Sequence, residues 1–524
     1  MARIAFLILC HKDPAGIAEQ ARRLTATGDC VAIHFDARAP QATWRALAGA
    51  VADIPRVHLV RRRVKCGWGE WSLVQATLNA LDEALAAFPR ATHFYMMSGD
   101  CWPIKPAHHV HRTLDAADAD FIESFDFLTS DWIKTGLKEE RLVYRHVFNE
   151  RTQKRAYYAA LALQEKLGLR RKLPGGIDIM IGSQWWCLRR RTAEAVMAFV
   201  RARRDVVRFF RTTWIPDETF FQTLVNHLIP TSEIERRSLT LKMFSDYGMP
   251  VVMYNDQYDL LVAQDALFAR KISPEAQDLK KRLGRLYGSA TEVVTSNEMP
   301  KLFAFLTGQG RIGHRFAPRF WERFSTIGRD RELLIVTCKK WHVAKRLTDQ
   351  VAWRSNIPAL EYIFDEEETR MPDLGGIEAT LPKRTRHHRA VMAMLFDHYE
   401  TDRLLICLDP ANFDLLADFY TDRSTTRMLE IETSLSDAYL AGHARRVGLA
   451  GPETSERTIR ELVPTIRAGI HLEIDRIRDA KFPNLHRIRE DASPDDNAGP
   501  LSRFLSMPRE VAREVAATHY LFAD

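Results

Sequence analysis

Short apolar runs alternate with longer amphipathic stretches over the first hundred residues, and few folds accommodate such a pattern. Residues 5–9, 31–35, 57–60 and 93–97 are short and mostly apolar, as buried strands are. Residues 72–87 instead repeat their apolar side chains at helical spacing. Strands that alternate with helices predict an α/β fold, in which helices flank a mostly parallel sheet.

Polar residues follow three of the predicted strands at a distance of one to three residues. His11 follows the first strand, Asp36 the second and Asp100 the fourth. Ligands of open parallel sheets bind at the carboxyl ends of the strands. We therefore expect these three side chains near a binding site.

A second alternating series begins near residue 331. Residues 332–337 and 404–408 have the pattern of buried strands, and residues 343–351 that of a helix. Between the two series, residues 192–211 are expected to form one helix with a basic exposed side. A chain of 524 residues exceeds the usual domain size of roughly 100–200 residues, so we expect several parts. These parts are a first domain at 1–275, a helical bridge at 276–330 and a second α/β domain at 331–524.

The composition excludes several classes of protein. Hydrophobic residues make up 46% and charged residues 27%, which is typical of a globular chain and unlike a disordered or collagen-like one. Lys plus Arg number 75 and Asp plus Glu 68, so the net charge is 75 − 68 = +7. This slight basic excess suits anionic ligands, and we expect no nucleic-acid partner.

The cysteines and the apolar runs indicate a cellular compartment. The seven cysteines are scattered and lack CxxC spacing, which argues against a zinc site and a disulfide framework and favours a reducing compartment. We find no signal peptide and no apolar run of about 20 residues. We therefore expect a cytoplasmic protein without a membrane span; peripheral membrane contact and the oligomeric state stay open.

Several motifs follow one another in a fixed order through the first domain. They read FLILCHKDP, IHFDARAP, WGEWSLVQATLNAL, MMSGDCWPIKP, IGSQWWCLRR, WIPDETFFQTLV and LFARK. Their order and spacing resemble the core-2/I-branching N-acetylglucosaminyltransferase and xylosyltransferase family. The resemblance implies a GT-A fold and an inverting transfer from a UDP-sugar, without a divalent metal or another cofactor. It does not extend to residues 331–524.

Glu218 is the predicted catalytic base. Inverting transfer to a hydroxyl needs a carboxylate within hydrogen-bond reach of the acceptor proton. Pro216 would set a turn and Asp217 could cap the helix that follows, with Glu218 in its first turn. The resemblance assigns the base to Glu218, whereas the residues alone equally allow a carboxylate that stabilises the helix dipole.

Cationic side chains are expected where the UDP leaving group binds. Many GT-A enzymes hold a metal ion with an Asp-x-Asp motif, but here Cys101 and Trp102 follow Asp100. Fixed cations would then have to stabilise the diphosphate. The resemblance assigns this role to Lys271, with Arg270 beside it, although a single lysine is more often solvated.

Further residues match positions that the family uses for its two substrates. A family arginine at the diphosphate has no clear counterpart; Lys242, Arg236 or Arg237 could take its place. On the donor side the resemblance adds Asp36 for the nucleoside, Trp68 for stacking and His11 for phosphate or ribose. On the acceptor side we expect Asp100, Glu123, Lys138, Arg141, Trp185, Trp186 and Asp217. Several have plainer alternatives: a strand-end cap for Asp36, a turn for Asp100, and core packing for Trp68 and one of the two adjacent tryptophans.

Residues 331–524 contain no motif that identifies a function. The predicted strand at 332–337 runs into Lys339 and Lys340 before a helix, and a helix N-terminus can hold phosphate or sulfate. The segment lacks the GxxxxGK spacing of a P-loop. A degenerate nucleotide or sulfonucleotide domain, an acceptor-binding or dimerisation domain, and a plain accessory domain all remain open.

The leading hypothesis is a metal-independent inverting glycosyltransferase. It would move N-acetylglucosamine or xylose from a UDP-sugar to a hydroxyl of a glycan, a lipid-linked molecule or a protein, with a β-linkage. The alternatives are a non-catalytic protein that binds carbohydrate or nucleotide, and a bifunctional enzyme whose second domain transfers sulfate or phosphate.

Overall fold

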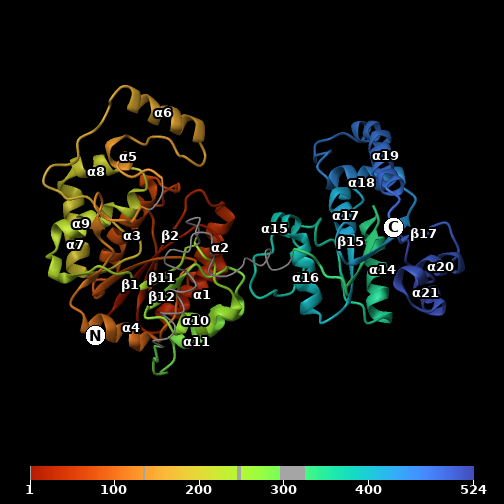
Figure 1. Ribbon diagram of the computed structural model, residues 1–524, viewed down its shortest axis with the longest axis horizontal. Helices are drawn as coiled ribbons and strands as arrows, with labels where there is room; N and C mark the ends of the chain where they lie inside the picture. Colours follow the sequence, from red (N-terminus) through yellow and green to blue (C-terminus); the bar gives the residue numbers. More distant parts are fainter. Residues whose placement is uncertain (1, 134–135, 245–249, 296–324, 524) are drawn as a thin grey trace. The chain divides into compact units, whose positions relative to one another are not determined.

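The chain forms two compact units, which are described separately below. The computed structural model describes residues 2–133, 136–244, 250–295 and 325–523. The N-terminal unit comprises residues 1–316 and the C-terminal unit residues 317–524 (Figure 1). Of the predicted bridge at 276–330, residues 296–324 lie outside the described part of the chain.

A seven-stranded mixed sheet forms the centre of the N-terminal unit, in the order β10-β6-β9-β4-β1-β2-β3. The strands are β1 (Ile4–Cys10), β2 (Cys30–Phe35), β3 (Val57–Leu59), β4 (His93–Ser98), β6 (Asp120–Phe121), β9 (Cys187–Arg189) and β10 (Ile234–Glu235). Strands β1 to β4 are parallel, and β9 runs antiparallel to both β4 and β6. The predicted strands and the α/β class are confirmed.

Helices flank this sheet in two groups (Figure 1). In the first, α1 (Pro14–Thr25) packs against β2 and α2 (Gln41–Val51). In the second, α3 (Trp71–Ala87) packs against β1 and β2, and α7 (Arg190–Ala202) packs against α3 and α9 (Phe220–Leu228). The start of α1 is encoded locally, because Pro14 follows Asp13, whose carboxylate accepts from the Gly16 N–H at 2.9 Å.

The single helix expected over 192–211 is a wrong prediction. The segment forms α7 and α8 (Arg204–Phe210), which are separated at Arg203 with φ −102° and ψ 67°. The Arg203 guanidinium binds both carboxylate oxygens of Asp205, at 2.9 and 2.8 Å, in the first turn of α8. The break therefore coincides with a side-chain contact that the apolar periodicity does not reveal.

A small second sheet brings basic residues to the edge of the N-terminal unit. Its strands β11 (Thr240–Lys242) and β12 (Phe268–Arg270) are parallel, and β12 is antiparallel to β5 (Trp102–Pro103). The register pairs Lys242 with Arg270. The helix α11 (Gln277–Tyr287) follows, and its Tyr287 hydroxyl donates to Asp29 at 3.2 Å.

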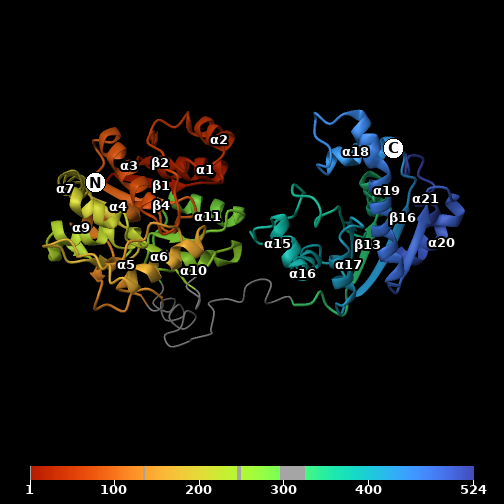
Figure 2. The same ribbon diagram turned by 90° about the horizontal axis from the view of Figure 1, so that it is seen from above.

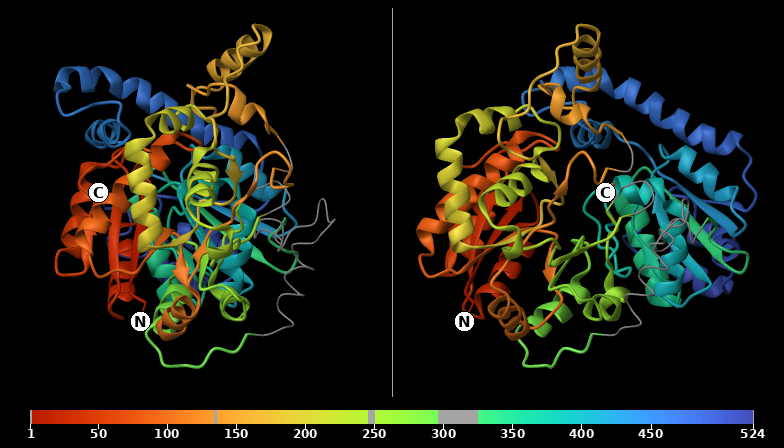
Figure 3. Two further views of the ribbon diagram at one scale, coloured as in Figure 1. Left: turned by 90° about the vertical axis from the view of Figure 1, so that its left-hand side faces the viewer. Right: turned by 60° about the vertical axis from the view of Figure 1, so that its left-hand side comes forward.

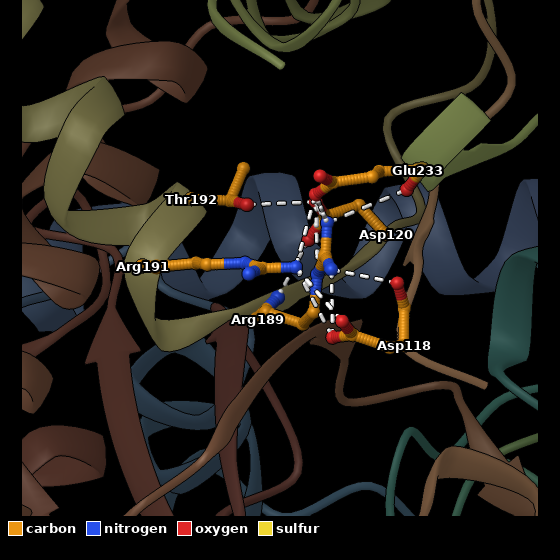
Figure 4. A network of polar contacts seen from close by, with 6 residues as sticks. All are labelled: Asp118, Asp120, Arg189, Arg191, Thr192 and Glu233. Atoms are coloured by element: carbon orange, nitrogen blue, oxygen red, sulfur yellow. Dashed lines mark hydrogen bonds and ion pairs between the residues drawn. The ribbon is translucent and has the colours of Figure 1, made fainter. Parts of the chain in front are cut away.

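An ion-pair network around the buried side chains of Arg189 and Asp120 joins the short strands at one end of the large sheet (Figure 4). Arg189 at the end of β9 contacts Asp118 and Asp120 at 2.8 Å each and Glu233 at 2.7 Å. The Asp120 carboxylate is fully buried and also accepts from the Thr192 hydroxyl at 2.7 Å. These contacts connect β6 and the segment before β10 to β9. They supplement the few backbone hydrogen bonds of β6 and β10, which have only two residues each.

The C-terminal unit contains a five-stranded, fully parallel sheet in the order β14-β15-β13-β16-β17. Its strands are β13 (Glu332–Thr337), β14 (Ala359–Leu360), β15 (Arg403–Leu408), β16 (Thr425–Glu432) and β17 (Leu485–Arg489). The predicted strands at 332–337 and 404–408 are confirmed. The predicted helix at 343–351 is also confirmed, as part of α14 (Trp341–Arg354).

Two hydrophobic clusters cover the two faces of this sheet. Helices of the unit lie on both sides of the sheet in Figure 2. Helices α16 (His388–His398) and α17 (Phe413–Tyr420) contribute to one cluster. Helices α14, α20 (Pro494–Leu505) and α21 (Arg509–Ala516) contribute to the other. Alternate residues of β13 enter the two clusters, with Ile335 in the first and Val336 in the second, as expected of a strand buried on both sides.

Two more helices of this unit, α18 (Asp437–Arg446) and α19 (Glu456–Asp479), follow β16 and pack against each other. The long α19 is seen in blue in both views of Figure 3. Within the described ranges, none of the helices combines the length and the apolar character that crossing a membrane requires.

Candidate active site

A cavity of about 490 Å³ opens in the N-terminal unit where β1 and β4 end. It gathers residues that are far apart in the sequence and that the sequence analysis had selected. They are His11, Trp68, Asp100, Trp185, Asp217, Glu218, Lys242, Arg270 and Lys271. The polar residues after β1 and β4 therefore lie where ligands of such sheets bind.

Glu218 lies on a short 3-10 turn, Pro216–Glu218, which the backbone of Ile215 introduces. Ile215 has φ 52°, a left-handed conformation that a β-branched residue rarely adopts. Its N–H donates to the Gly69 carbonyl at 3.1 Å, and the Gly182 N–H donates to the Glu218 carbonyl at 2.9 Å. Main-chain hydrogen bonds thus fix both ends of the segment from Ile215 to Glu218. Strained backbone conformations such as that of Ile215 are often found at functional sites.

The Glu218 carboxylate contacts a cationic side chain. Arg141, in α5 (Glu140–Val143), donates from Nη1 to Oε2 of Glu218 at 3.2 Å. Burial raises the pKa of Glu218, and the Arg141 charge opposes this rise. A half-buried carboxylate with a raised pKa and a fixed partner can accept a proton from a bound hydroxyl.

Asp217 does not cap the following helix, contrary to the expectation. The turn begins at Ile215, and no side-chain cap is formed at the start of either the turn or α9. The Oδ1 atom of Asp217 is instead buried without a hydrogen-bond partner among the described residues. Burial, followed by the neighbouring Glu218 charge, raises the pKa of Asp217 to about 7. Asp217 thus contributes a buried carboxyl group to the wall of the cavity.

A second carboxylate, that of Glu123, reaches the cavity through Lys242. Lys242 donates from Nζ to Oε2 of Glu123 at 2.6 Å, and the Ser183 N–H donates to the same oxygen at 3.2 Å. Burial lowers the pKa of Lys242, while Glu123 opposes this. The sequence analysis placed these residues on opposite substrate sides, whereas the structure pairs them directly.

Gly182 lies between the two carboxylate-bearing segments. A Cβ atom at this position would stand 2.0 Å from the backbone oxygen of Glu123. The same glycine donates its N–H to the Glu218 carbonyl. Only glycine allows this close approach to Glu123 while the contact to Glu218 is kept.

The ends of β11 and β12 supply three cationic side chains to the cavity. Lys271 lies 3.4 Å from Asp100, between Nζ and Oδ2, and the Arg270 guanidinium stacks 4.3 Å above the Trp185 ring. Lys242 lies beside Arg270 in the strand register. Of the three candidates for the family arginine, Lys242 lines the cavity, whereas Arg236 and Arg237 do not.

Trp68 is a partly exposed aromatic residue at the cavity, with 43% of its surface accessible. Its ring meets Trp214 edge-on at 5.8 Å, and the guanidinium of Arg151 lies 3.9 Å from its centroid. Arg151 also lines the cavity and was not selected from the sequence. The loop that carries it leads into α6 (Lys154–Lys166), which projects from the unit in Figure 3.

Other predicted residues do not line this cavity. The Asp36 carboxylate accepts the N–H groups of Arg38 at 2.7 Å and Cys66 at 3.3 Å, which fits its plainer reading as a strand-end cap. Trp186 is buried in the core against Phe221, with centroids 5.0 Å apart. Lys138 donates to the Ser130 carbonyl at 3.3 Å, and Arg141 acts through its contact with Glu218.

Across the described ranges, no group of three or more His, Cys, Asp or Glu side chains is arranged to hold a metal ion. His11 is exposed at the cavity. The cavity lining combines carboxylates and cations with aromatic rings and with the uncharged polar side chains of Ser98, Ser183 and Gln184.

Both halves of the chain match known families. Residues 4–260 match the family described as Core-2/I-Branching enzyme. Residues 270–524 match a family of unknown function (DUF5928).

Curated relatives resemble part of this chain at low identity. One is a beta-1,3-galactosyl-O-glycosyl-glycoprotein beta-1,6-N-acetylglucosaminyltransferase 3 of Ovis aries, 21% identical over 221 residues, which cover 42% of this chain and 46% of the relative. Another is a xylosyltransferase of Ciona intestinalis, 25% identical over 197 residues, which cover 37% of this chain and 21% of the relative. The chain thus spans less than half the length of either relative.

Proposed function

Residues 4–260 belong to the Core-2/I-branching enzyme family, and from this premise we propose that the protein is a metal-independent inverting glycosyltransferase. The donor is a UDP-sugar, UDP-N-acetylglucosamine or UDP-xylose, in keeping with the names of the two curated relatives. The acceptor is a hydroxyl of a glycan, a lipid-linked molecule or a protein. The observation that carries the proposal is the position of Glu218 in one cavity with Lys271 and Arg270.

In the proposed reaction, Glu218 accepts the proton of the acceptor hydroxyl. The acceptor oxygen then forms a bond to the anomeric carbon, while the bond from that carbon to the phosphate oxygen breaks. The electron pair of the broken bond leaves with UDP. Lys271 and Arg270 stabilise the charge that develops on the diphosphate, a role that other GT-A enzymes give to a metal ion.

The pairing of Glu218 with Arg141 supports this assignment. A base must be ionised before it takes a proton, and burial alone disfavours the ionised carboxylate. Arg141 opposes that effect at 3.2 Å. The contact favours the ionised form of Glu218 and occupies its Oε2 atom, which leaves Oε1 for the acceptor hydroxyl.

The cysteines support a reducing compartment as part of the proposal. All seven are free thiols, and five of them are buried. Structural disulfides are common in small exported domains and rare in reducing compartments.

The test measures UDP release from UDP-N-acetylglucosamine and UDP-xylose in EDTA, for the wild type and for Glu218→Gln. We expect the substitution to lower the rate about 100-fold or more, because it removes general-base catalysis, while UDP still binds. Glu165→Gln, on the exposed face of α6, is the matched control and should retain the wild-type rate. Full activity of Glu218→Gln would contradict the mechanism. UDP binding without any release by the wild type would favour the alternative of a non-catalytic binding protein.

A further inference from the structure

A second cavity, of about 1200 Å³, lies in the C-terminal unit. Its lining comes from the segment between β13 and α14, from the first turns of α14, from the segments that follow β14 and β15, and from α18 and α19. These segments follow the carboxyl ends of parallel strands, where such sheets bind ligands. The volume is at or above the upper range of small-molecule sites, about 300–1000 Å³, so it admits an extended ligand.

The charges around this cavity are balanced internally. Its lining contains four carboxyl groups, those of Asp365, Glu366, Asp409 and Glu473, and three permanent cations, those of Lys339, Lys345 and Arg446. Lys339 is buried and lies 2.8 Å from both Asp409 and Glu473. Lys345 lies 2.9 Å from Glu366. An anionic ligand would therefore have to displace carboxylates to reach either lysine, whereas Arg446 lies over the Tyr439 ring, 5.1 Å from its centroid.

Rigid aromatic side chains accompany the carboxylates. The Trp341 indole N–H donates to Oδ2 of Asp409 at 2.6 Å, and its ring stacks on Tyr362 at 4.3 Å between centroids. The Tyr439 hydroxyl donates to the Lys339 carbonyl at 2.7 Å. Both rings line the cavity in fixed positions, because each polar atom already has a partner.

We propose that this cavity binds a neutral carbohydrate of more than one sugar ring. Sugar hydroxyls would donate to Asp409 and Glu473, which are acceptors only, and the apolar face of a ring would lie on Trp341 or Tyr439. A phosphate or sulfate would instead bring negative charge towards these carboxylates, which repel it. The inference concerns the C-terminal unit alone and does not rest on the proposed function.

Hydrogen–deuterium exchange on the full chain tests the proposal without any substitution. The probes are chitotetraose, xylotetraose and maltotetraose, compared with inorganic phosphate, UDP and 3′-phosphoadenosine-5′-phosphosulfate. We expect at least one tetrasaccharide to slow exchange in residues 337–345, 409–413 and 436–446. No protection there by any tetrasaccharide overturns the proposal. Protection there by an anionic probe alone also overturns it and assigns the cavity to anions.

A matched pair of substitutions on α19 tests the carboxylate contact. Glu473→Gln alters the cavity lining, whereas Glu461→Gln alters an exposed ion pair with Arg457 on the same helix. The affinity for the tetrasaccharide that gives protection is measured by titration calorimetry. It should be about tenfold lower for Glu473→Gln, because a hydrogen bond to a charged acceptor is weakened. It should be unchanged for Glu461→Gln. Equal affinity in the two variants would place the sugar elsewhere. Hydrogen–deuterium exchange of the buried strands β13 and β15 without sugar serves as the folding control, since both strands lie in the same unit as Glu473.

Discussion

Replacing Arg141 with methionine should move the acid limb of the pH–rate profile to higher pH. Methionine keeps much of the side-chain volume and removes the guanidinium that lies 3.2 Å from Glu218. Burial raises the pKa of Glu218, and Arg141 lowers it. Without Arg141 only the raising effect remains. Glu218 is then protonated, and inactive as a base, up to a higher pH than in the wild type.

The size of the shift follows from the geometry of the contact. An arginine within about 4–6 Å lowers a carboxyl pKa by about 1–3 units. The Glu218 side chain is 32% exposed, so solvent screens part of this interaction. We therefore expect the lower half of the range, and the acid limb should move upward by about 1–2 pH units. Above both limbs the rates of the two proteins should converge.

The assay measures UDP release from the donor with water as acceptor, between pH 4 and pH 9. Using water matters because Arg141 is also a predicted acceptor contact, and this assay removes that contribution. Arg141→Lys restores the charge and should return most of the shift. Arg145→Met, which removes an exposed arginine four residues away, is the matched control. A limb that stays in place, or that moves to lower pH, would refute the reasoning.

Three further predictions concern the diphosphate site and the stability of each unit. Lys271→Met should weaken UDP binding by about tenfold or more, because a charged hydrogen bond to the diphosphate is lost; titration calorimetry should show no such loss for the exposed Lys281→Met. Arg189→Met should lower the free energy of unfolding by about 3–5 kcal/mol in urea, because it leaves the buried Asp120 carboxylate without its cation. Arg203→Met, which removes a solvent-exposed pair with Asp205, should leave the urea midpoint unchanged. Burial is the main cause that raises the pKa of Asp365 to about 7 in the native state. In the unfolded state its pKa is near the ordinary value of about 3.9. Between these two values the native state keeps the proton and the unfolded state has lost it. The wild type therefore loses stability between about pH 4 and pH 7, and Asp365→Asn should be more stable than the wild type at pH 8 but not at pH 4.

Each of these predictions has an outcome that would contradict it. Unchanged UDP affinity in Lys271→Met would remove that lysine from the diphosphate site. A urea midpoint for Arg189→Met equal to that of Arg203→Met would mean that the network of Figure 4 contributes little stability. Equal gains for Asp365→Asn at pH 4 and pH 8 would show that its effect is not linked to the proton.

The sequence predicts the parts of the fold that depend on local pattern. The central strands of both sheets are buried on two sides, so they appear as short continuous apolar runs. Residues that directly follow such strands, such as Asp100, could therefore be assigned to the binding edge. The turn that carries Glu218 was also expected from Pro216, although its entry through the positive φ of Ile215 was not.

Contacts between distant segments account for most of what the sequence could not predict. Lys242 and Glu123 are 119 residues apart, and Arg141 and Glu218 are 77 residues apart. Such pairs depend on how loops return to the sheet edge, which no periodicity records. The same holds for Arg151. Its contact with Trp68 depends on the path of the loop that carries it, and the sequence pattern does not predict that path.

Gly182 fixes the distance between two parts of the site through its backbone. Its backbone contacts the segments of both Glu123 and Glu218. The spacing of these two segments is therefore set by main-chain contacts and does not depend on side-chain rotamers. An enzyme built in this way can change its acceptor through the side chains at the rim of the cavity while Glu218, the proposed base, keeps the same position. Conversely, a single methyl group at residue 182 would displace the segments of Glu123 and Glu218 together. Engineering of acceptor choice should therefore begin at the rim and leave this glycine untouched.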